Sequence, residues 1–221
     1  GRRHGASELT IKGSDTMVHL VSAWAEAYME RHEETEISVT GGGSGTGFAA
    51  LLNGTTDICA ASRAMMPREQ ELARERDVTP RSYTVARDGI AIITHPSNMV
   101  DALSLEQLRK IYTGAYDQWS QVGGAKREMV VFSRDTSSGT YVYFQKHVLR
   151  KRDFRRDARL MPATSTIVQS VAEDHGAIGY VGLGYALGAG RRVKSLAISK
   201  SRDETAIEPS IESVRSGRYS I

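Results

Sequence analysis

Three short polar segments stand where a predicted strand passes into a predicted helix, and each could bind an anion. They read SDT at 14–16, GGGSGTG at 41–47 and RDTSSGT at 134–140. Small residues leave backbone N–H groups accessible, and the first turn of a helix offers unpaired donors and a partial positive charge. Arg134 adds a guanidinium that can donate two parallel hydrogen bonds to an oxyanion. The sequence therefore predicts an oxyanion site built from these junctions.

The glycine-rich segment does not match the common nucleotide-binding or nucleophile loops. No Lys-Ser/Thr pair follows its glycines, which excludes a P-loop. Thr46 stands where G-x-G-x-x-G and a G-x-S-x-G centred on Ser44 both require glycine. For any one segment alone, a structural turn or a helix cap is an alternative interpretation. The recurrence of the strand, polar turn and helix unit favours a binding site.

The composition indicates a folded, soluble chain of one large or two small domains. The chain has 221 residues, of which 40% are hydrophobic and 25% charged, with a net charge of +3. No apolar run approaches the roughly 20 residues of a membrane span. Residues 1–10 carry basic side chains without a following apolar segment, so we expect no signal peptide within this sequence. Cys59 is the only cysteine, which excludes an intrachain disulfide.

Residues that would support metal binding, catalysis or nucleic-acid binding are not grouped in the patterns that those functions need. The six histidines are dispersed, and none pairs with Cys, Asp or Glu at a metal-ligand spacing, so we expect no metal and no cofactor. Ser44 and Ser138 have no histidine near them in sequence to act as a base. The basic run at 149–159 includes acidic residues and indicates a solvated surface, so no nucleic-acid partner is expected.

Strands and helices alternate along the first part of the chain. Strands are predicted at 8–13, 35–40 and 56–62, and helices at 14–32, 48–54 and 67–77. This order predicts a parallel sheet with helices on its faces. Ser14 or Asp15 is expected to cap the first helix. One buried stripe is predicted along that helix, formed by Met17, Leu20, Val21, Trp24, Ala25 and Tyr28.

The remainder of the chain continues as α/β. Strands are predicted at 83–95, 128–134, 176–182 and 193–199, and helices at 103–114, 141–149 and 165–174. Helix 103–114 should bury Leu105, Leu108, Ile111 and Tyr112 on one face and end at Gly114.

Several motifs occur in an order that resembles one known family. They read GSDTM, GGGSGTG, TTDICAASR, LSLEQLRKIYTGAYDQW, SRDTSSGT and GAIGYVGLGYA, and the resemblance extends from about 8 to 219. Together they look like the periplasmic phosphate-binding protein of the ABC-type phosphate transporter. The resemblance implies an α/β, two-lobed periplasmic-binding-protein (type II) fold, each lobe a sheet flanked by helices. It also implies binding of inorganic phosphate, delivery to a membrane permease without chemistry, and a periplasmic or extracytoplasmic location.

The resemblance also implies which residues bind the ligand. By motif, these are Thr16 and Met17 in the first loop, Ser44, Gly45 and Thr46 in the second, and Arg134, Ser138, Gly139 and Thr140 in the third. The sequence has Ser62 and Arg63 where well-known members have an aspartate that accepts the phosphate proton. We therefore expect Arg63 to act as a second guanidinium. Asp15 is expected to supply some of the acceptor function, with a simple N-cap role as the alternative.

The resemblance implies two lobes, at 8–88 with 193–221 returning to it, and at 89–192. Hinges are expected at 85–89 and 191–195. Family members usually continue with a further segment, whereas this sequence stops at Ile221. A fragment, a domain of a larger protein and a chain completed by a second copy in a dimer are the alternatives. For function, the alternatives are another oxyanion such as sulfate or molybdate, a sensing or adhesion module of a larger surface protein, and a phosphatase-like enzyme.

Overall fold

The computed structural model describes residues 7–221, which divide into two compact units. The first unit comprises the chain up to Tyr83 together with Ser137–Gly139, and the second comprises Thr84–Thr136 and Thr140–Ile221. Residues 1–6, part of the segment in which no signal peptide was expected, lie outside the described residues. None of the described helices is long and apolar enough to cross a membrane.

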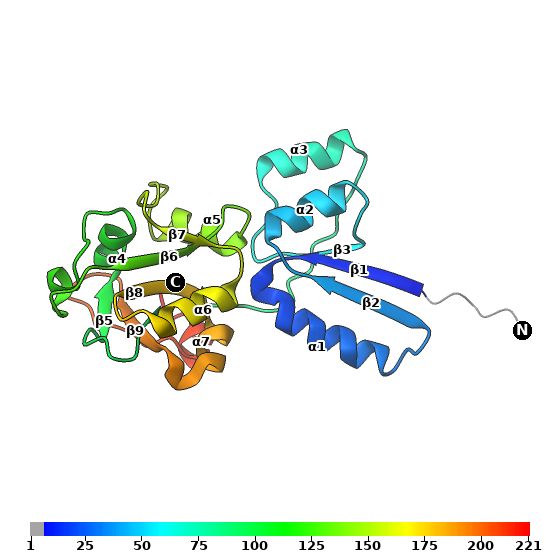
Figure 1. Ribbon diagram of the computed structural model, residues 1–221. Helices are drawn as coiled ribbons and strands as arrows, with labels where there is room; N and C mark the ends of the chain where they lie inside the picture. The colour runs from blue at the N-terminus through cyan, green and yellow to red at the C-terminus, as the bar shows by residue number, and fades with distance from the viewer. Residues whose placement is uncertain (1–6) are drawn as a thin grey trace, which may run out of the picture. The chain divides into compact units, whose positions relative to one another are not determined.

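The first unit is a three-stranded parallel sheet with helices on its two faces (Figure 1). The strand β1 (Ser7–Gly13) lies between β2 (Thr35–Thr40) and β3 (Ile58–Ala60). The helices are η1 (Asp15–Met17), α1 (Val18–Met29), α2 (Ser44–Leu52) and α3 (Pro67–Glu75). Figure 1 shows α1 on one side of the sheet, and α2 with α3 beyond it on the other. The predicted β-α-β-α-β order is confirmed for this unit.

The start and the buried face of the first helix differ from the sequence prediction. The helix begins with the tight turn η1, and Ser14 precedes that turn without a capping bond from its side chain. Of the six residues in the predicted buried stripe, only Val21 and Ala25 are buried. Because this sheet has three strands, it packs against a narrow strip of the α1 surface. Consequently Leu20, Trp24 and Tyr28 are exposed by 39%, 45% and 48%.

The second unit contains a six-stranded sheet in the order β5-β9-β4-β8-β6-β7. Its strands are β4 (Ile90–Thr94), β5 (Ala102–Ser104), β6 (Val130–Arg134), β7 (Arg159–Met161), β8 (Ala177–Gly182) and β9 (Lys194–Ser199). Its helices are α4 (Leu105–Tyr112), η2 (Trp119–Val122), α5 (Gly139–His147), α6 (Thr164–Glu173), α7 (Leu183–Ala189), η3 (Gly190–Arg192) and α8 (Ile211–Arg215). The central strand β4 runs antiparallel to both of its neighbours, β8 and β9.

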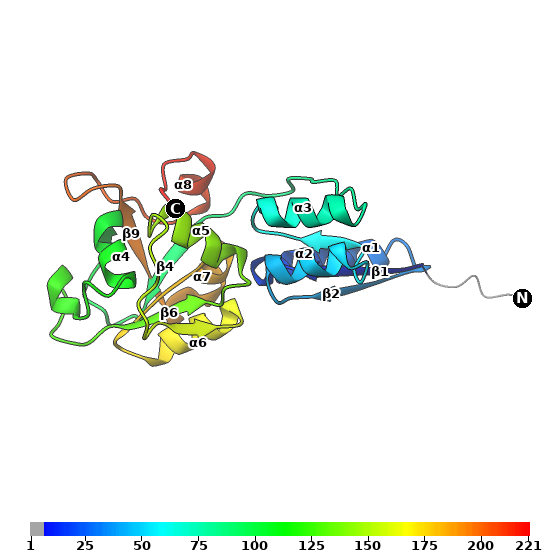
Figure 2. The ribbon, with the colours of Figure 1, turned by 90° about the horizontal axis from the view of Figure 1, so that it is seen from above.

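Helices cover both faces of this sheet, as the two views in Figures 1 and 2 show. The strands β4 and β8 are buried along their whole length, which is expected for strands covered on both faces. Residues Leu108, Ile111 and Tyr112 of α4 are buried as predicted, whereas Leu105 is only partly buried. Ser104 caps this helix, since its Oγ accepts a hydrogen bond of 3.2 Å from Gln107 N.

The placement of the C-terminal segment at 193–221 corrects the predicted lobes. This segment was expected to return to the first lobe, but β9 pairs with β4 and β5 in the sheet of the second unit. The chain end lies beside β4 as well, because Ile90 N donates to Ile221 O at 3.2 Å. Burial of Leu196 and Ile198 in the second core accounts for this placement. Residues 191–195 are therefore not a hinge, and the units divide at 83–84 rather than at 88–89.

Candidate anion-binding site

In the first unit, hydroxyl groups from three loops form a connected chain. Ser14 Oγ lies 2.7 Å from Thr16 Oγ1 and donates to Ser62 Oγ at 3.0 Å. Ser62 Oγ in turn lies 3.2 Å from Ser44 Oγ. Ser14 and Ser62 follow the carboxyl ends of the parallel strands β1 and β3, and Ser44 follows β2. Such ends share one edge of a sheet, which is where open α/β sheets bind ligands.

The helix α2 begins beside these hydroxyls and adds backbone donors. Its first residue is Ser44, whose Oγ accepts a hydrogen bond of 3.0 Å from Ser62 N. Ser44 and Thr46 lie in the first turn, where N–H groups have no partner within the helix. The Gly45 N–H, which was expected to contact the anion, instead donates to Ser137 O at 3.0 Å.

Two glycines allow the segment Ser137–Gly139 to lie against these loops within the first unit. A Cβ on Gly43 would lie 2.5 Å from Ser137 Oγ. A Cβ on Gly139 would clash with Ser62 Oγ and would lie 2.5 Å from Ser44 Oγ. Both positions therefore require glycine for close packing of one loop on another.

Arg63 is held by an acidic partner on α3. Its Nη1 and Nη2 donate to the two carboxylate oxygens of Glu69 at 2.7 and 2.6 Å, and the guanidinium lies 5.0 Å from the Phe48 ring centroid. Burial would raise the pKa of Glu69, but hydrogen bonds from Arg63 and from Met66 N lower it below its ordinary value. The Arg63 side chain is 10% exposed, and its buried Nε–H has no hydrogen-bond partner. Only part of this guanidinium is therefore committed to the ion pair.

In the second unit, Arg134 is fixed at the carboxyl end of β6. Its Nη1 donates to Thr164 Oγ1 at 2.8 Å, its Nη2 to Pro162 O at 2.9 Å, and its Nε to Met161 O at 3.2 Å. The residue is 1% exposed. These bonds leave the side chain little freedom, so a ligand that contacts this guanidinium would meet a preorganised group.

The structure brings some of the predicted site residues together and places others in separate groups. Thr16, Ser44 and Ser62 share the hydroxyl chain. Asp15 and Met17 lie in the adjacent turn η1, in which Asp15 Oδ1 lies 3.4 Å from the position of a Cβ on Gly41. The remaining residues are placed as follows: Gly45, Thr46, Arg63, Ser138 and Gly139 lie in the first unit, and Arg134 and Thr140 in the second.

Sequence reasoning missed Thr164, and it gave Ser14 only as part of the segment 14–16 and as a helix cap. Ser14 directly follows β1, and its place in the recurring strand, hydroxyl turn and helix unit is a signal that could have found it. Thr164 is 30 residues from Arg134 in sequence, and only the pairing of β6 with β7 brings the two segments together. Among residues 7–221, no group of three or more His, Cys, Asp or Glu side chains could hold a metal ion.

Comparisons with known proteins decide the family. A family model described as a PBP superfamily domain matches residues 1–221. The phosphate-binding protein PstS of Pseudomonas aeruginosa strain PAO1 is 30% identical over 227 residues, covering 97% of this chain and 69% of that protein. The chain belongs to the PBP superfamily and to the family of the phosphate-binding protein PstS. The protein SphX of Synechococcus elongatus is also 30% identical, over 96% of this chain and 64% of its own length.

Solved structures agree with the family assignment. One is a protein from Clostridium perfringens described as a phosphate ABC transporter substrate-binding protein, with bound phosphate. It has a TM-score of 0.87 and 27% identity, covering 97% of this chain and 83% of that chain. An ABC-type phosphate transport receptor from Vibrio cholerae has a TM-score of 0.72 and 29% identity, with the same two coverages. The expected α/β fold class of the type II periplasmic binding proteins is confirmed.

Proposed function

We propose that the chain binds inorganic phosphate and releases it chemically unchanged. The observation that carries this proposal is the chain of hydroxyls formed by Thr16, Ser14, Ser62 and Ser44 at the start of α2. Hydroxyls and first-turn N–H groups can donate to several oxygens of a small anion at once. The family assignment and the phosphate-bound Clostridium structure support phosphate as that anion.

The charged residues complete the proposed site. Arg134 supplies a charge-assisted hydrogen bond, and its three bonds to neighbouring oxygens hold it in place. Arg63 contributes through its buried Nε–H while Glu69 neutralises most of its charge. Ser138, Gly139 and Thr140 contribute hydroxyl and N–H donors at the start of α5.

The connected hydroxyl groups can also accept a hydrogen bond from the protonated oxygen of phosphate. Phosphate near neutral pH carries a proton that sulfate lacks, so a site that accepts a hydrogen bond favours phosphate. A serine or threonine hydroxyl both donates and accepts, unlike an N–H group. In well-known family members an aspartate acts as this acceptor, and here Ser62 and Arg63 stand at its position. We propose that the connected hydroxyl groups, together with Asp15, act as the acceptor instead. Sulfate is the alternative ligand if this acceptor is too weak.

The proposed partner is an ABC permease, and the proposed location is periplasmic or extracytoplasmic. The transporter names of the Clostridium and Vibrio structures support this context. The exposed apolar residues Leu20, Trp24 and Tyr28 on α1 favour a further association of the first unit. A second copy of the chain, or a further segment, would fill that role. The second candidate function is that of a sensing or adhesion module in a larger surface protein, and the exposed apolar residues of α1 are the observation that favours it.

Equilibrium dialysis with labelled orthophosphate tests the proposed function. The wild-type chain should bind phosphate saturably, and a Ser44→Ala/Ser62→Ala double variant should bind it about tenfold more weakly or worse, because it loses two hydroxyl partners. Thr55→Ala is the matched control, since Thr55 Oγ1 donates to Ala50 O at the other end of α2. Wild-type affinity in the double variant would contradict the site, and turnover of a phosphate monoester would contradict binding without chemistry.

A further inference from the structure

A second concentration of positive charge lies in the second unit, in a cavity between α4 and the segment that follows α5. The cavity has a volume of about 520 Å³. Its charged lining consists of Arg109, Lys110, Arg150, Arg152, Lys200 and one acid, Glu106. Glu106 is already paired with Lys110 at 2.7 Å. Five cations and one carboxylate leave an excess of four positive charges, far from the balance expected of a solvated helix face.

The arginines of this cavity are close enough to repel one another. Arg109 Nε donates to Val148 O at 2.9 Å, which fixes its guanidinium at the cavity. Burial and the neighbouring charges of Arg150 and Arg152 lower the pKa of Arg109. Within residues 7–221, neither Arg150, Arg152 nor Lys200 has a carboxylate within ion-pair distance. A bound anion would relieve this repulsion.

The backbone at the edge of the cavity is also unusual. Arg150 and Lys151 have φ angles of 53° and 65°, in the left-handed region that bulky residues rarely adopt. Such strain is found where the surrounding structure or a function maintains it. Arg150 and Arg152, on either side of Lys151, both line this cavity.

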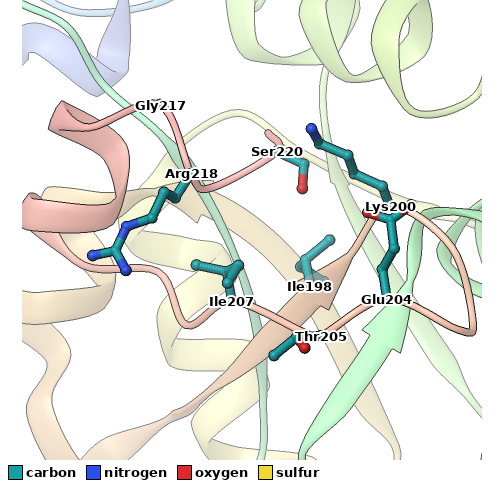
Figure 3. A pocket seen from close by; sticks show the side chains of 8 residues that line it. All are labelled: Ile198, Lys200, Glu204, Thr205, Ile207, Gly217, Arg218 and Ser220. Carbon is teal, nitrogen blue, oxygen red and sulfur yellow. The ribbon is translucent and has the colours of Figure 1, made fainter.

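A neighbouring cavity of about 440 Å³ shows what an ordinary charge balance looks like. Figure 3 shows its lining, in which Lys200 and Arg218 extend to different parts of the cavity and Ile198 and Ile207 contribute apolar surface. Arg218 is paired with Glu212 at 2.7 Å, and the lining also includes Glu204. The cavity of about 440 Å³ therefore lacks the excess of four positive charges found in the cavity of about 520 Å³.

We propose that the cavity of about 520 Å³, called the basic cavity below, binds an anion with linked phosphoryl groups, such as a short polyphosphate chain. The cavity is much larger than one orthophosphate needs, and its cations are spread over α4, the segment 150–152 and the end of β9. Each phosphoryl group carries negative charge at neutral pH, so a few linked groups can neutralise four cations. Arginine guanidinium groups suit phosphoryl oxygens through paired hydrogen bonds. This site is separate from the proposed orthophosphate site and does not depend on it.

Calorimetric titration with tripolyphosphate, in the presence of saturating orthophosphate, tests this inference. The wild-type chain should bind one tripolyphosphate in addition to orthophosphate. Arg150→Glu/Arg152→Glu should weaken that binding by about tenfold or more, while leaving the orthophosphate affinity within about twofold. Arg191→Glu/Arg192→Glu is the matched control, because both are exposed arginines of the same unit outside the cavity and the change in net charge is the same. Circular dichroism confirms that each variant is folded.

The outcomes separate this inference from the proposed function. Absence of a tripolyphosphate site in the wild-type chain, or an unchanged site in the double variant, would overturn the inference whatever orthophosphate does. Equal weakening by Arg191→Glu/Arg192→Glu, or equal binding of citrate, would also overturn it, since either shows a general charge effect. ATP distinguishes the source of the ligand: affinity equal to that of tripolyphosphate supports a nucleotide, and weaker affinity supports a free polyphosphate chain.

Discussion

The hydroxyl groups of Ser14, Thr16, Ser44 and Ser62 form a connected group at the ends of the strands in the first unit. Each hydroxyl can reverse its role between donor and acceptor, so the group as a whole can adapt to a protonated or an ionised oxygen. Of the two arginines predicted to bind the ligand, Arg63 is paired with Glu69, whereas Arg134 bonds only to neutral oxygens among its printed contacts. These different roles lead to separate predictions for the two kinds of residue.

Replacement of Arg134 tests the charged part of the site. Arg134→Ala should weaken phosphate binding by about 2–5 kcal/mol, because it removes one partner of a buried charge-assisted contact. Arg134→Lys should restore only part of this loss, since lysine cannot bond Met161 O, Pro162 O and Thr164 Oγ1 together. Calorimetry measures the affinity, and thermal unfolding of each variant serves as the control for stability. An alanine variant that binds within about twofold of wild type would remove Arg134 from the site.

Replacement of Asp15 tests the origin of selectivity. If the carboxylate accepts a phosphate proton, Asp15→Asn should narrow the preference for phosphate over sulfate. Its stability should change little, because asparagine serves near helix starts about as well as aspartate. Competition titrations measure the preference. An unchanged ratio would assign proton acceptance to the hydroxyl chain alone and restrict Asp15 to its turn.

The elements position the site through close approaches that particular residues permit. The start of α2 and the segment Ser137–Gly139 lie against each other, and Gly43 and Gly139 provide the space. Farther along the chain, the bond between Arg63 and Glu69 joins the loop after β3 to the first turn of α3. Both features are properties of how elements meet rather than of one side chain.

A pair of alanine substitutions tests the requirement for close approach. Gly139→Ala should weaken phosphate binding by about tenfold or more, because the added methyl group would displace the hydroxyls of Ser44 and Ser62. Gly184→Ala is the control, since a Cβ there would lie in open space with nothing within 4 Å. Dialysis of both variants gives the comparison. Equal affinity in the two would show that Gly139 is needed only for the turn, if at all.

The ion pair on α3 should make stability depend on pH. Hydrogen bonds from Arg63 lower the pKa of Glu69 in the folded chain, so the pair stabilises the fold above the unfolded pKa of glutamate. That contribution should be lost as the pH falls through about 4 and below. Glu69→Gln should therefore lose stability at neutral pH and show a shallower loss between about pH 5 and 3. Urea unfolding measures this, and parallel curves for the two proteins would contradict the coupling.

Local patterns predicted most elements because local chemistry determines them. Pro67 at the start of α3 and the apolar spacing of Leu108 and Ile111 in α4 both act within a few residues. The buried face of α1 was predicted wrongly, because burial of Trp24 depends on how wide the sheet beneath it is. Likewise, the partners of Arg63 and Arg134 follow from packing between segments and not from motif spacing.

For the whole chain, the two units have unequal cores. The first has a three-stranded sheet, and the second has six strands whose central pair is fully buried. The family resemblance implied that the segment 193–221 returns to the first lobe, and this assignment was wrong. Only the pairing of β9 with β4 and β5 decides between the two units. The short motifs occur in a fixed order along the sequence, and this order indicated the family. It carried no information about which strands pair over long sequence distances.

Calorimetric titration of the unaltered chain with orthophosphate, followed by sulfate in excess, is the most direct test of phosphate binding. We predict saturable binding of one phosphate, with little change in its apparent affinity when sulfate is present. This result follows if the hydroxyl chain and Arg134 form a site that accepts a protonated oxyanion. Absence of phosphate binding, or sulfate binding as tight as that of phosphate, would contradict the assignment of this chain as a selective phosphate-binding protein.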